Sequence, residues 1–370
     1  MTDDPTMKIA LITIHYANSY GGCLQALASQ SVLSRYGEVS IIDYKTPTLA
    51  TGMSLIRFSS NPRSILHVIK DLCRIFPRRR LLAKFKAFMA QYYLLTSRCD
   101  DSSDLEALND KYDIFICGSD QIWNPSVTGG LDLNYLLAFV KDKPRVAFST
   151  SAGSYVFDEV ELGLVKKAVM KFNFLAFREM DTVQSLKVVN GRDDIECTID
   201  PTLLLDRYEW RSLLGLHGET SKDSYILVYG LKKNCLVYDV AKKISLHLGL
   251  KLVAVDQDPF LVSRVDNHLQ DASPVDFVSL IDKADFVVTN SFHGTAFAVN
   301  FGIPFLSIKP DTGFNRIKCF LEDVGLEGRI VESLDTTDTE LALDINFQSA
   351  HRRLAALREK SFTFLNKVFS

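Results

Sequence analysis

Short apolar runs alternate with amphipathic helical patterns along almost the whole chain. The first set of apolar runs predicts strands at Ile9–Ile14, Val39–Tyr44, Asp113–Cys117, Val146–Thr150, Phe174–Phe177 and Glu196–Ile199. After Asp200, a second set predicts strands at Tyr225–Tyr229, Leu252–Val255, Phe286–Thr289 and Phe305–Ile308. Strands that alternate with helices in this way form βαβ units, so we expect an α/β protein with parallel sheets.

Two Rossmann-like lobes account best for the two sets of strands. Pro201 cannot donate to a strand ladder and a new helical pattern begins at Arg207, so we place the hinge between the lobes near Asp200–Asp206. We expect an N-terminal lobe over residues 1–200, a C-terminal lobe over 201–345 and a C-terminal helix over 346–370. Ligands of such folds bind at the carboxyl ends of the strands, and in a two-lobed protein we expect them in the cleft between lobes.

The composition excludes several classes of protein. The chain has 370 residues, 47% of them hydrophobic, which is enough for a sizeable core, and its net charge of −3 gives no general attraction to nucleic acid. The cysteines are scattered without a CxxC pair, so neither a disulfide framework nor a zinc site is expected. No secretory signal pattern or membrane span is visible, and the default expectation is a cytoplasmic enzyme.

One strongly basic run extends from Arg74 through Arg80, with Lys84 and Lys86 after it. It lies between two helical patterns, Ser64–Phe76 and Leu81–Tyr93, so we interpret it first as a solvated turn between helices. The alternative is a peripheral membrane contact, with anionic lipid or a lipid diphosphate acceptor at the inner face of the membrane.

The most informative histidine is His293, which lies between an apolar run and a helical pattern. The strand predicted at Phe286–Thr289 is followed by Asn290 or Ser291 as an N-cap and by a helix at Gly294–Phe301. His293 therefore lies at the carboxyl end of a strand beside a helix N-terminus, where anionic ligands bind. In the alternative interpretation Asn290 and Ser291 only cap the helix, and His293 forms a hydrogen bond across the loop.

A second histidine, His15, is a weaker candidate for a general acid. It follows the first predicted strand and precedes the turn at Gly21 and Gly22. Histidine exchanges a proton near neutral pH, so either residue suits a general acid, with His293 favoured by its helix start.

The segment NSFHGTAF around His293, followed by a strand and Lys309, resembles the polysaccharide pyruvyl transferase family. Further stretches agree with this family in order: NSYGGCLQ, GSDQIWNP, FREMDT and IDPTLLL. The resemblance extends from about Lys8 to Arg329 and implies a fold like that of GT-B glycosyltransferases. It also implies transfer of a pyruvyl group from phosphoenolpyruvate, as co-substrate, to hydroxyls of a saccharide or a lipid-linked glycan, forming a ketal in exopolysaccharide or cell-surface biosynthesis.

Phosphoenolpyruvate carries a phosphate and a carboxylate, so a site for it needs cationic donors. His293 would be the general acid, and the remaining donor-binding candidates are Arg178, Ser291, Gly294, Lys309 and Arg316. Other branches of the family have Arg-Leu immediately before the histidine, where this chain has Ser291 and Phe292, and Lys309 is the natural substitute for that arginine. Surface pairing is the alternative for Arg316, and a salt bridge with Glu179 or Asp181 is the alternative for Arg178.

The acceptor site is expected in the N-terminal lobe. Gly21 and Gly22 form a tight turn before a helix, which suits a diphosphate or a sugar hydroxyl. Asp120, Gln121 and Trp123 supply a carboxylate, an amide and an indole that is able to lie against a sugar face. The alternatives are that Trp123 covers the edge of the core and that Asp120 is a local cap.

Two rival functions remain open in the sequence. A GT-B glycosyltransferase with a nucleotide-sugar donor would have a similar fold, and a non-catalytic glycan-binding subunit would keep Trp123 while tolerating loss of His293. The sequence has no HExxH, CxxC or GxGxxG motif, so we expect neither a metal nor a nicotinamide cofactor.

Overall fold

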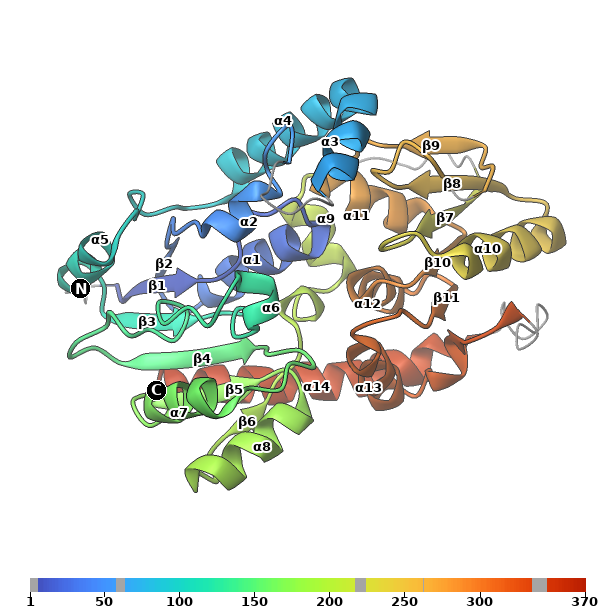
Figure 1. The fold of residues 1–370 in the computed structure, drawn as a ribbon. Coiled ribbons are helices and arrows are strands. Elements are labelled where there is room, and N and C mark those ends of the chain that lie inside the picture. The colour runs from blue at the N-terminus through green and yellow to red at the C-terminus, as the bar shows by residue number, and fades with distance from the viewer. Residues whose placement is uncertain (1–5, 58–63, 217–223, 262, 335–344) are drawn as a thin grey trace. The chain divides into compact units, whose positions relative to one another are not determined.

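The computed structural model describes residues 6–57, 64–216, 224–261, 263–334 and 345–370. The chain divides into two compact units (Figure 1). The first unit contains Met1–Met53, Met89–Leu204 and Leu357–Ser370, and the second contains Ser54–Phe88 and Leu205–Ala356. The chain thus enters the second unit early, at Ser54, and its last residues return to the first. The lobe boundaries expected from the sequence did not assign Ser54–Phe88 to the second unit or Leu357–Ser370 to the first.

The first unit is built on a six-stranded sheet in which every pair of neighbours is parallel, with strand order β2-β1-β3-β4-β5-β6. Its strands are β1 (Lys8–Ile12), β2 (Glu38–Ile41), β3 (Ile114–Cys117), β4 (Arg145–Thr150), β5 (Phe174–Phe177) and β6 (Glu196–Cys197). Its helices are α1 (Tyr20–Leu33), α2 (Pro47–Thr51), α5 (Ser102–Glu106), α6 (Pro125–Thr128), α7 (Glu159–Val169) and α8 (Met180–Asn190), with short 3-10 turns at Ala107–Asp110 and Pro201–Leu203.

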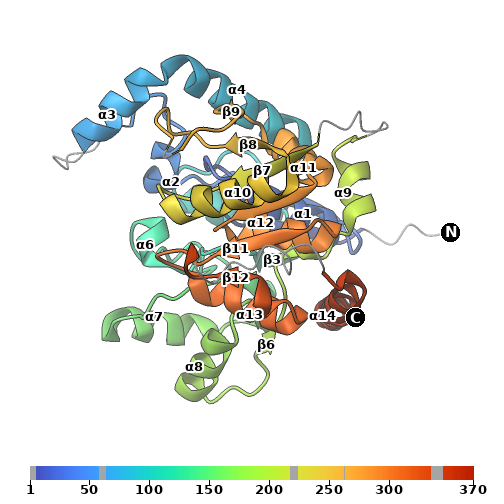
Figure 2. The ribbon, with the colours of Figure 1, turned by 90° about the vertical axis from the view of Figure 1, so that its right-hand side faces the viewer.

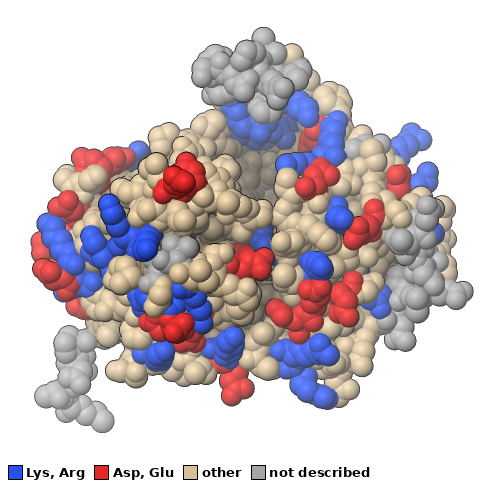
Figure 3. All heavy atoms as spheres, turned by 60° about the horizontal axis from the view of Figure 1, so that its bottom comes forward, with Lys and Arg blue, Asp and Glu red and all other residues tan. Residues whose placement is uncertain are grey.

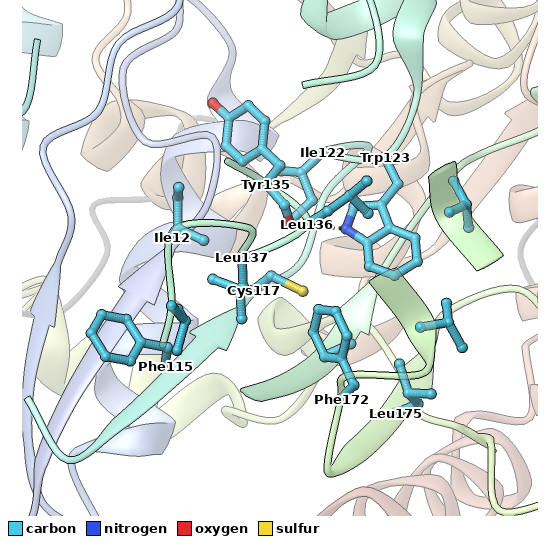
Figure 4. Close-up of a cluster of buried hydrophobic side chains, with 14 of the residues drawn as sticks. Ile12, Phe115, Cys117, Ile122, Trp123, Tyr135, Leu136, Leu137, Phe172 and Leu175 are labelled. Atoms are coloured by element: carbon cyan, nitrogen blue, oxygen red, sulfur yellow. Dashed lines mark hydrogen bonds between the residues drawn. The ribbon is translucent and has the colours of Figure 1, made fainter. Parts of the chain in front are cut away.

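The core of the first unit lies against this sheet (Figure 4). Strand residues that point to one face, such as Ile12, Phe115 and Cys117, pack with side chains from the connecting segments. Strand β3 is buried at every position, and because a strand covered on both faces needs apolar residues throughout, its sequence is the continuous apolar run IFIC.

The second unit has its own six-stranded parallel sheet, with strand order β12-β11-β10-β7-β8-β9. Its strands are β7 (Tyr225–Tyr229), β8 (Lys251–Val255), β9 (Asn267–Leu269), β10 (Phe286–Thr289), β11 (Phe305–Ile308) and β12 (Ile330–Val331). Its helices are α3 (Ser64–Cys73), α9 (Arg207–Leu213), α10 (Cys235–Leu248), α11 (Pro274–Lys283), α12 (Phe292–Phe301) and α13 (Phe314–Val324), with a 3-10 turn at Glu327–Arg329. Helix α10 covers one face of this sheet, and α11 and α12 cover the other (Figure 2).

Two long helices belong to both units. Helix α4 (Ile75–Tyr92) crosses from the second unit to the first, and α14 (Phe347–Val368) crosses back at its middle. The predicted α/β class, the parallel strands and the C-terminal helix are therefore confirmed. No helix in the described ranges is both long and apolar enough to cross a membrane.

The order of each sheet reverses at one place. In the first sheet the reversal lies between β1 and β3, and in the second it lies between β7 and β10. Connections leave such a pair of strands in opposite directions, so the carboxyl ends of the pair border a crevice where ligands of open α/β sheets bind. Gly22 and Asp120 follow β1 and β3, whereas His293 follows β10, so the predicted residues lie at these two places.

The basic run is not a solvated turn, and that prediction is wrong. Helices α3 and α4 are separated by Arg74 alone. Arg74 and Arg78 are buried and surround Asp71, which also accepts hydrogen bonds from Arg57 at 2.9 to 3.0 Å. Two of the positive charges of the run, on Arg74 and Arg78, are thus paired with Asp71 inside the second unit.

Candidate functional site

The turn between β10 and α12 is fixed by its own hydroxyl groups. Ser291 is the N-cap of α12, and its side chain accepts a hydrogen bond from the Gly294 amide at 3.4 Å. Thr289 Oγ1 accepts from the Ser291 amide at 3.0 Å and donates to the Tyr229 carbonyl at 2.7 Å. The helix begins at Phe292, two residues earlier than predicted, so His293 lies inside its first turn.

Asn290 has a different role from the cap considered for it. Its side chain accepts a hydrogen bond from the Leu231 amide at 2.6 Å and donates to the Leu231 carbonyl at 3.1 Å. Leu231 follows β7, so these two bonds join the loops after β7 and β10, the strands between which the sheet order reverses. The loop that carries His293 is therefore held in place by hydrogen bonds to the loop after β7.

Gly294 permits close approach of helix α12 to strand β10. A Cβ atom added at this position would lie 2.5 Å from Thr289 Oγ1 and 3.0 Å from Thr289 Cγ2. Thr289 is β-branched and its hydroxyl is engaged in the two bonds above, so it cannot move aside cheaply. The glycine thus has a packing role, in addition to its predicted place in donor binding.

Replacing Gly294 with alanine is expected to lower the free energy of unfolding by about 1–3 kcal/mol, the usual cost of overpacking a buried contact. The matched control is Gly163→Ala, because Gly163 lies in helix α7 with nothing within 4 Å of the added Cβ. That control should gain up to about 1 kcal/mol through helix propensity. Urea titrations of both variants measure the two changes, and equal stability of Gly294→Ala and the parent would contradict the packing role.

His293 and Arg316 lie around the same aromatic ring. His293 contacts Phe292 edge-on, with ring centroids 5.2 Å apart, and the Arg316 guanidinium lies 5.8 Å from the Phe292 centroid. Both side chains are partly exposed, whereas Phe292 is buried. Arg316 comes from the start of α13, so two elements bring a titratable group and a fixed cation to the start of α12.

Lys309 follows β11, as predicted, but its ammonium is engaged elsewhere. It pairs with Glu332 at 2.7 Å and lies 5.0 Å from the ring centroid of Phe314. Within the described ranges, no hydrogen bond, ion pair or ring contact joins Lys309 to His293. Arg316, which lies at the same Phe292 ring as His293, is thus the predicted cation that these contacts bring to the start of α12.

Arg178 forms a buried ion pair in the first unit. Its guanidinium lies 2.7 Å from Asp200 Oδ2, and the two side chains are 4% and 0% exposed. A longer bond of 3.4 Å reaches the Ser119 hydroxyl. The observed ion pair is thus with Asp200, which follows the neighbouring strand β6, whereas the salt-bridge alternative had named Glu179 or Asp181.

Glu179 and Ser151 are polar residues of this edge that sequence reasoning missed. Ser151 donates to Glu179 Oε1 at 2.6 Å and accepts from the Gly153 amide at 3.0 Å. Glu179 belongs to the FREMDT segment, and Asp200, the partner of Arg178, belongs to the IDPTLLL segment. The family-like stretches were therefore the signal in the sequence that could have identified these two residues.

Asp120 lies against the start of helix α1. A Cβ atom on Gly22 would be 3.4 Å from Asp120 Oδ2, and the Gly22 amide donates to Ser19, the N-cap of α1. Gly21, in the same first turn, is buried. A carboxylate already faces this positive helix end, which disfavours a diphosphate there and favours a neutral hydroxyl group.

Two residues near this edge have strained backbones. Asp120 has φ of 71° and Ser149 has φ of 53°, both in the left-handed region that non-glycine residues rarely adopt. Ser149 is held by hydrogen bonds to the Ile199 carbonyl at 2.8 Å and the Thr198 hydroxyl at 3.1 Å. Such strain persists where the surrounding structure enforces it, and it concentrates at functional sites.

Trp123 is part of the core, so its predicted role as an exposed sugar platform is wrong. The side chain is 1% exposed, and its indole N–H donates to the Tyr135 carbonyl at 3.0 Å (Figure 4). Its ring packs edge-on against Phe172 and Phe177. Gln121 remains partly exposed, and its Oε1 accepts a hydrogen bond from Asn124 Nδ2 at 2.8 Å.

His15, the second candidate acid, is buried in an ion-pair network. Its Nε2 lies 3.1 Å from Asp43 Oδ1 and its Nδ1 lies 3.3 Å from the Thr13 carbonyl oxygen. Burial alone would raise the pKa of Asp43, but hydrogen bonds from His15 and Lys45 outweigh it and lower that pKa to about 2. This arrangement suits a structural pair rather than a proton donor to a ligand.

The described residues contain no group of three or more His, Cys, Asp or Glu side chains placed to hold a metal ion. The predicted residues instead form two groups, each within one unit. Ser291, His293, Gly294 and Arg316 gather at the start of α12. Gly22, Asp120 and Arg178 gather at the carboxyl edge of the first sheet, where Arg178 reaches Ser119, the residue before Asp120.

A family model of polysaccharide pyruvyl transferases matches residues 20–312. The chain belongs to the polysaccharide pyruvyl transferase family. The matched segment begins at the first residue of α1 and includes both residue groups except Arg316. No curated protein is significantly similar in sequence to this family member.

Several solved structures are similar to this family member at low sequence identity. UDP-N-acetylglucosamine 2-epimerase from Rickettsia bellii is 11% identical, with a TM-score of 0.50 over 98% of this chain and 97% of that one. The UDP-GlcNAc 2-epimerase from Neisseria meningitidis bound to UDP-GlcNAc is 12% identical, with a TM-score of 0.48 over 98% and 99% of the two chains. Arabidopsis thaliana UGT89C1 complexed with quercetin is 12% identical, with a TM-score of 0.47 over 98% of each chain. The likeness to the Rickettsia bellii epimerase, with its TM-score of 0.50, shows a GT-B-like fold and nothing further.

Proposed function

We propose that the protein transfers pyruvate from phosphoenolpyruvate to a saccharide, as a ketal, in cell-surface or exopolysaccharide biosynthesis. The observation that carries this proposal is the place of His293, in the first turn of α12 and at the same Phe292 ring as Arg316, in a chain of the pyruvyl transferase family. A helix N-terminus, a fixed cation and a partly exposed histidine together suit an anionic substrate that must be protonated.

The reaction needs one proton at carbon and one leaving phosphate. His293 would deliver its proton to the methylene carbon of phosphoenolpyruvate, which makes the adjacent carbon electrophilic. A sugar hydroxyl then bonds to that carbon, and a second hydroxyl displaces phosphate to close the ketal. Of the two hydroxyl protons released, one would restore the protonated His293 and the other would leave with phosphate. The α12 N-terminus and Arg316 would stabilise the phosphate and carboxylate charges.

Acceptor binding would fall to Asp120 and Gln121. Both are partly exposed at the carboxyl edge of the first sheet, and a carboxylate and an amide are suitable partners for sugar hydroxyls. Arg178 would act indirectly, because its guanidinium is committed to Asp200 and holds the strand end that precedes Glu179.

Ligand protection against heat unfolding tests the choice of donor. Phosphoenolpyruvate added to EDTA-treated protein is expected to raise the unfolding midpoint, since a ligand at 100 times its Kd stabilises the native state by about 2.7 kcal/mol. Inorganic phosphate alone is the control for simple anion binding and should protect less. Protection by UDP-GlcNAc with none by millimolar phosphoenolpyruvate would favour the glycosyltransferase alternative. Phosphate release, followed by ³¹P NMR with candidate saccharides, then tests transfer itself.

A further inference from the structure

Helices α3 and α4 present one continuous face to solvent. The two helices run on through Arg74, whose amide donates to Lys70 and whose carbonyl accepts from Arg78. Exposed apolar side chains recur at helical spacing along this face, at Ile69, Leu72 and Phe76, which are 52%, 51% and 75% exposed. Continuing the same spacing, exposed basic side chains follow at Arg79 and Lys86. We call these five residues the outer face of α3–α4.

The opposite side of α3–α4 is anchored to the second unit. Besides the buried cluster around Asp71, three basic residues flank the helices and pair with acidic residues in the loops after β8 and β9 and in the first turn of α11. These pairs are Lys70 with Asp258 at 2.8 Å, Arg80 with Asp271 at 2.5 Å and Lys84 with Asp276 at 3.3 Å. The anchoring fixes which side of the helices points outward, so exposure of the outer face is a property of the folded unit.

The charge of this region contrasts with that of the whole chain. Between Ser64 and Tyr92 there is one acidic residue, Asp71, against seven lysines and arginines, whereas the protein carries a net charge of −3. On the face that Figure 3 shows, basic and acidic side chains are interspersed over much of the surface. Neither Arg79 nor Lys86 has an ion-pair partner among the described residues. The basic end of the outer face is therefore a local feature that is available to an anionic partner.

We propose that the outer face of α3–α4 docks the protein on a bilayer that contains anionic lipids. Ile69, Leu72 and Phe76 would enter the boundary between headgroups and acyl chains, while Arg79 and Lys86 would contact lipid phosphates. The binding of helices at a membrane interface increases with the apolar area that they bury and with their electrostatic attraction to anionic lipids, and the outer face offers both contributions. Lysine and arginine also suit this position because their aliphatic stems reach past apolar surface to the charged layer.

A bilayer fits this face better than a protein partner. A stable protein interface takes about 20–30 residues from each side, and the apolar stripe has only three large side chains. A symmetric dimer would pair the outer face with itself, and because this face has no acidic residue it would offer Arg79 and Lys86 no opposite charge. A membrane surface needs neither a broad apolar patch nor a complementary shape.

Vesicle sedimentation with the full-length protein tests this docking. The protein should bind vesicles of equal parts phosphatidylcholine and phosphatidylglycerol, bind phosphatidylcholine vesicles weakly, and be released by salt. Phe76→Ala should weaken binding about tenfold through lost apolar burial. Arg79→Ala and Lys86→Ala should each weaken it about fivefold, the usual contribution of one basic residue at an anionic surface.

The matched controls lie on helix α10 of the same unit. Leu246→Ala removes a side chain that is 78% exposed, and Lys242→Ala removes an exposed charge, so both should leave vesicle binding unchanged. Equal binding to both kinds of vesicle, or equal effects of outer-face and α10 variants, would overturn the proposal. Self-association that Phe76→Ala abolishes without vesicles would also overturn it, in favour of a protein interface. Pyruvyl transfer to a soluble acceptor is measured separately and should be unchanged in Phe76→Ala, so failure of docking and failure of the proposed function are distinguishable.

Discussion

Replacing His293 with alanine is expected to lower the turnover of pyruvyl transfer by roughly 10²-fold or more, the usual effect of removing a general acid. The side chain is partly exposed and its ring contacts Phe292, so the folded unit should tolerate the change. The loss should therefore appear in kcat, with little change in the unfolding midpoint or in the KM for phosphoenolpyruvate. Phosphate release measured with saturating donor and acceptor gives kcat directly.

The matched control for this prediction is His351→Ala. His351 Nε2 lies 2.8 Å from the Val299 carbonyl oxygen, so this histidine contacts the same helix, α12, near its other end. Its replacement should change stability more than turnover. Turnover of His293→Ala near that of the parent, or an equal loss in both histidine variants, would remove His293 from the proposed chemistry.

The strands were the most predictable part of the fold, because continuous apolar runs mark strands buried on both faces. Every predicted strand is present, and Phe286–Thr289 and Tyr225–Tyr229 have the predicted bounds. The two strands that were missed are short: β9 has the sequence NHL, and β12 has two residues. Neither provides an apolar run of its own, so each is defined only by pairing with a neighbour at the edge of its sheet.

The roles of site residues were predictable where they depend on neighbouring residues in the sequence. They were not predictable where they depend on contacts with distant parts of the chain. Ser291 as an N-cap follows from local chemistry, and the structure confirms it. The burial of Trp123 depends on Phe172 and Phe177, which come from other parts of the fold, so an indole beside Asp120 and Asn124 looked equally suited to a sugar. The bonds between Asn290 and Leu231 depend on the strand order, which the sequence pattern does not give.

The pairing of Arg178 with Asp200 follows from the same order of strands. Strands β5 and β6 are parallel neighbours, so the residues just after them meet at one edge of the sheet. An arginine in this place was expected to bind the donor, whereas the observed contact is a buried ion pair. The two roles lead to different consequences when the arginine is replaced.

Replacing Arg178 with glutamine is expected to lower the free energy of unfolding by about 3–5 kcal/mol, because it removes the cation from a carboxylate with 0% exposure. Asp200 also accepts hydrogen bonds from the Thr202 amide at 2.9 Å and hydroxyl at 2.6 Å, and asparagine can accept these bonds through its own side-chain oxygen. The double variant Arg178→Gln with Asp200→Asn should therefore recover part of the loss. A double-mutant cycle by urea titration measures this coupling. If Arg178 instead binds the donor, Arg178→Gln would raise the KM for phosphoenolpyruvate selectively while stability changed little, and the double variant would recover nothing.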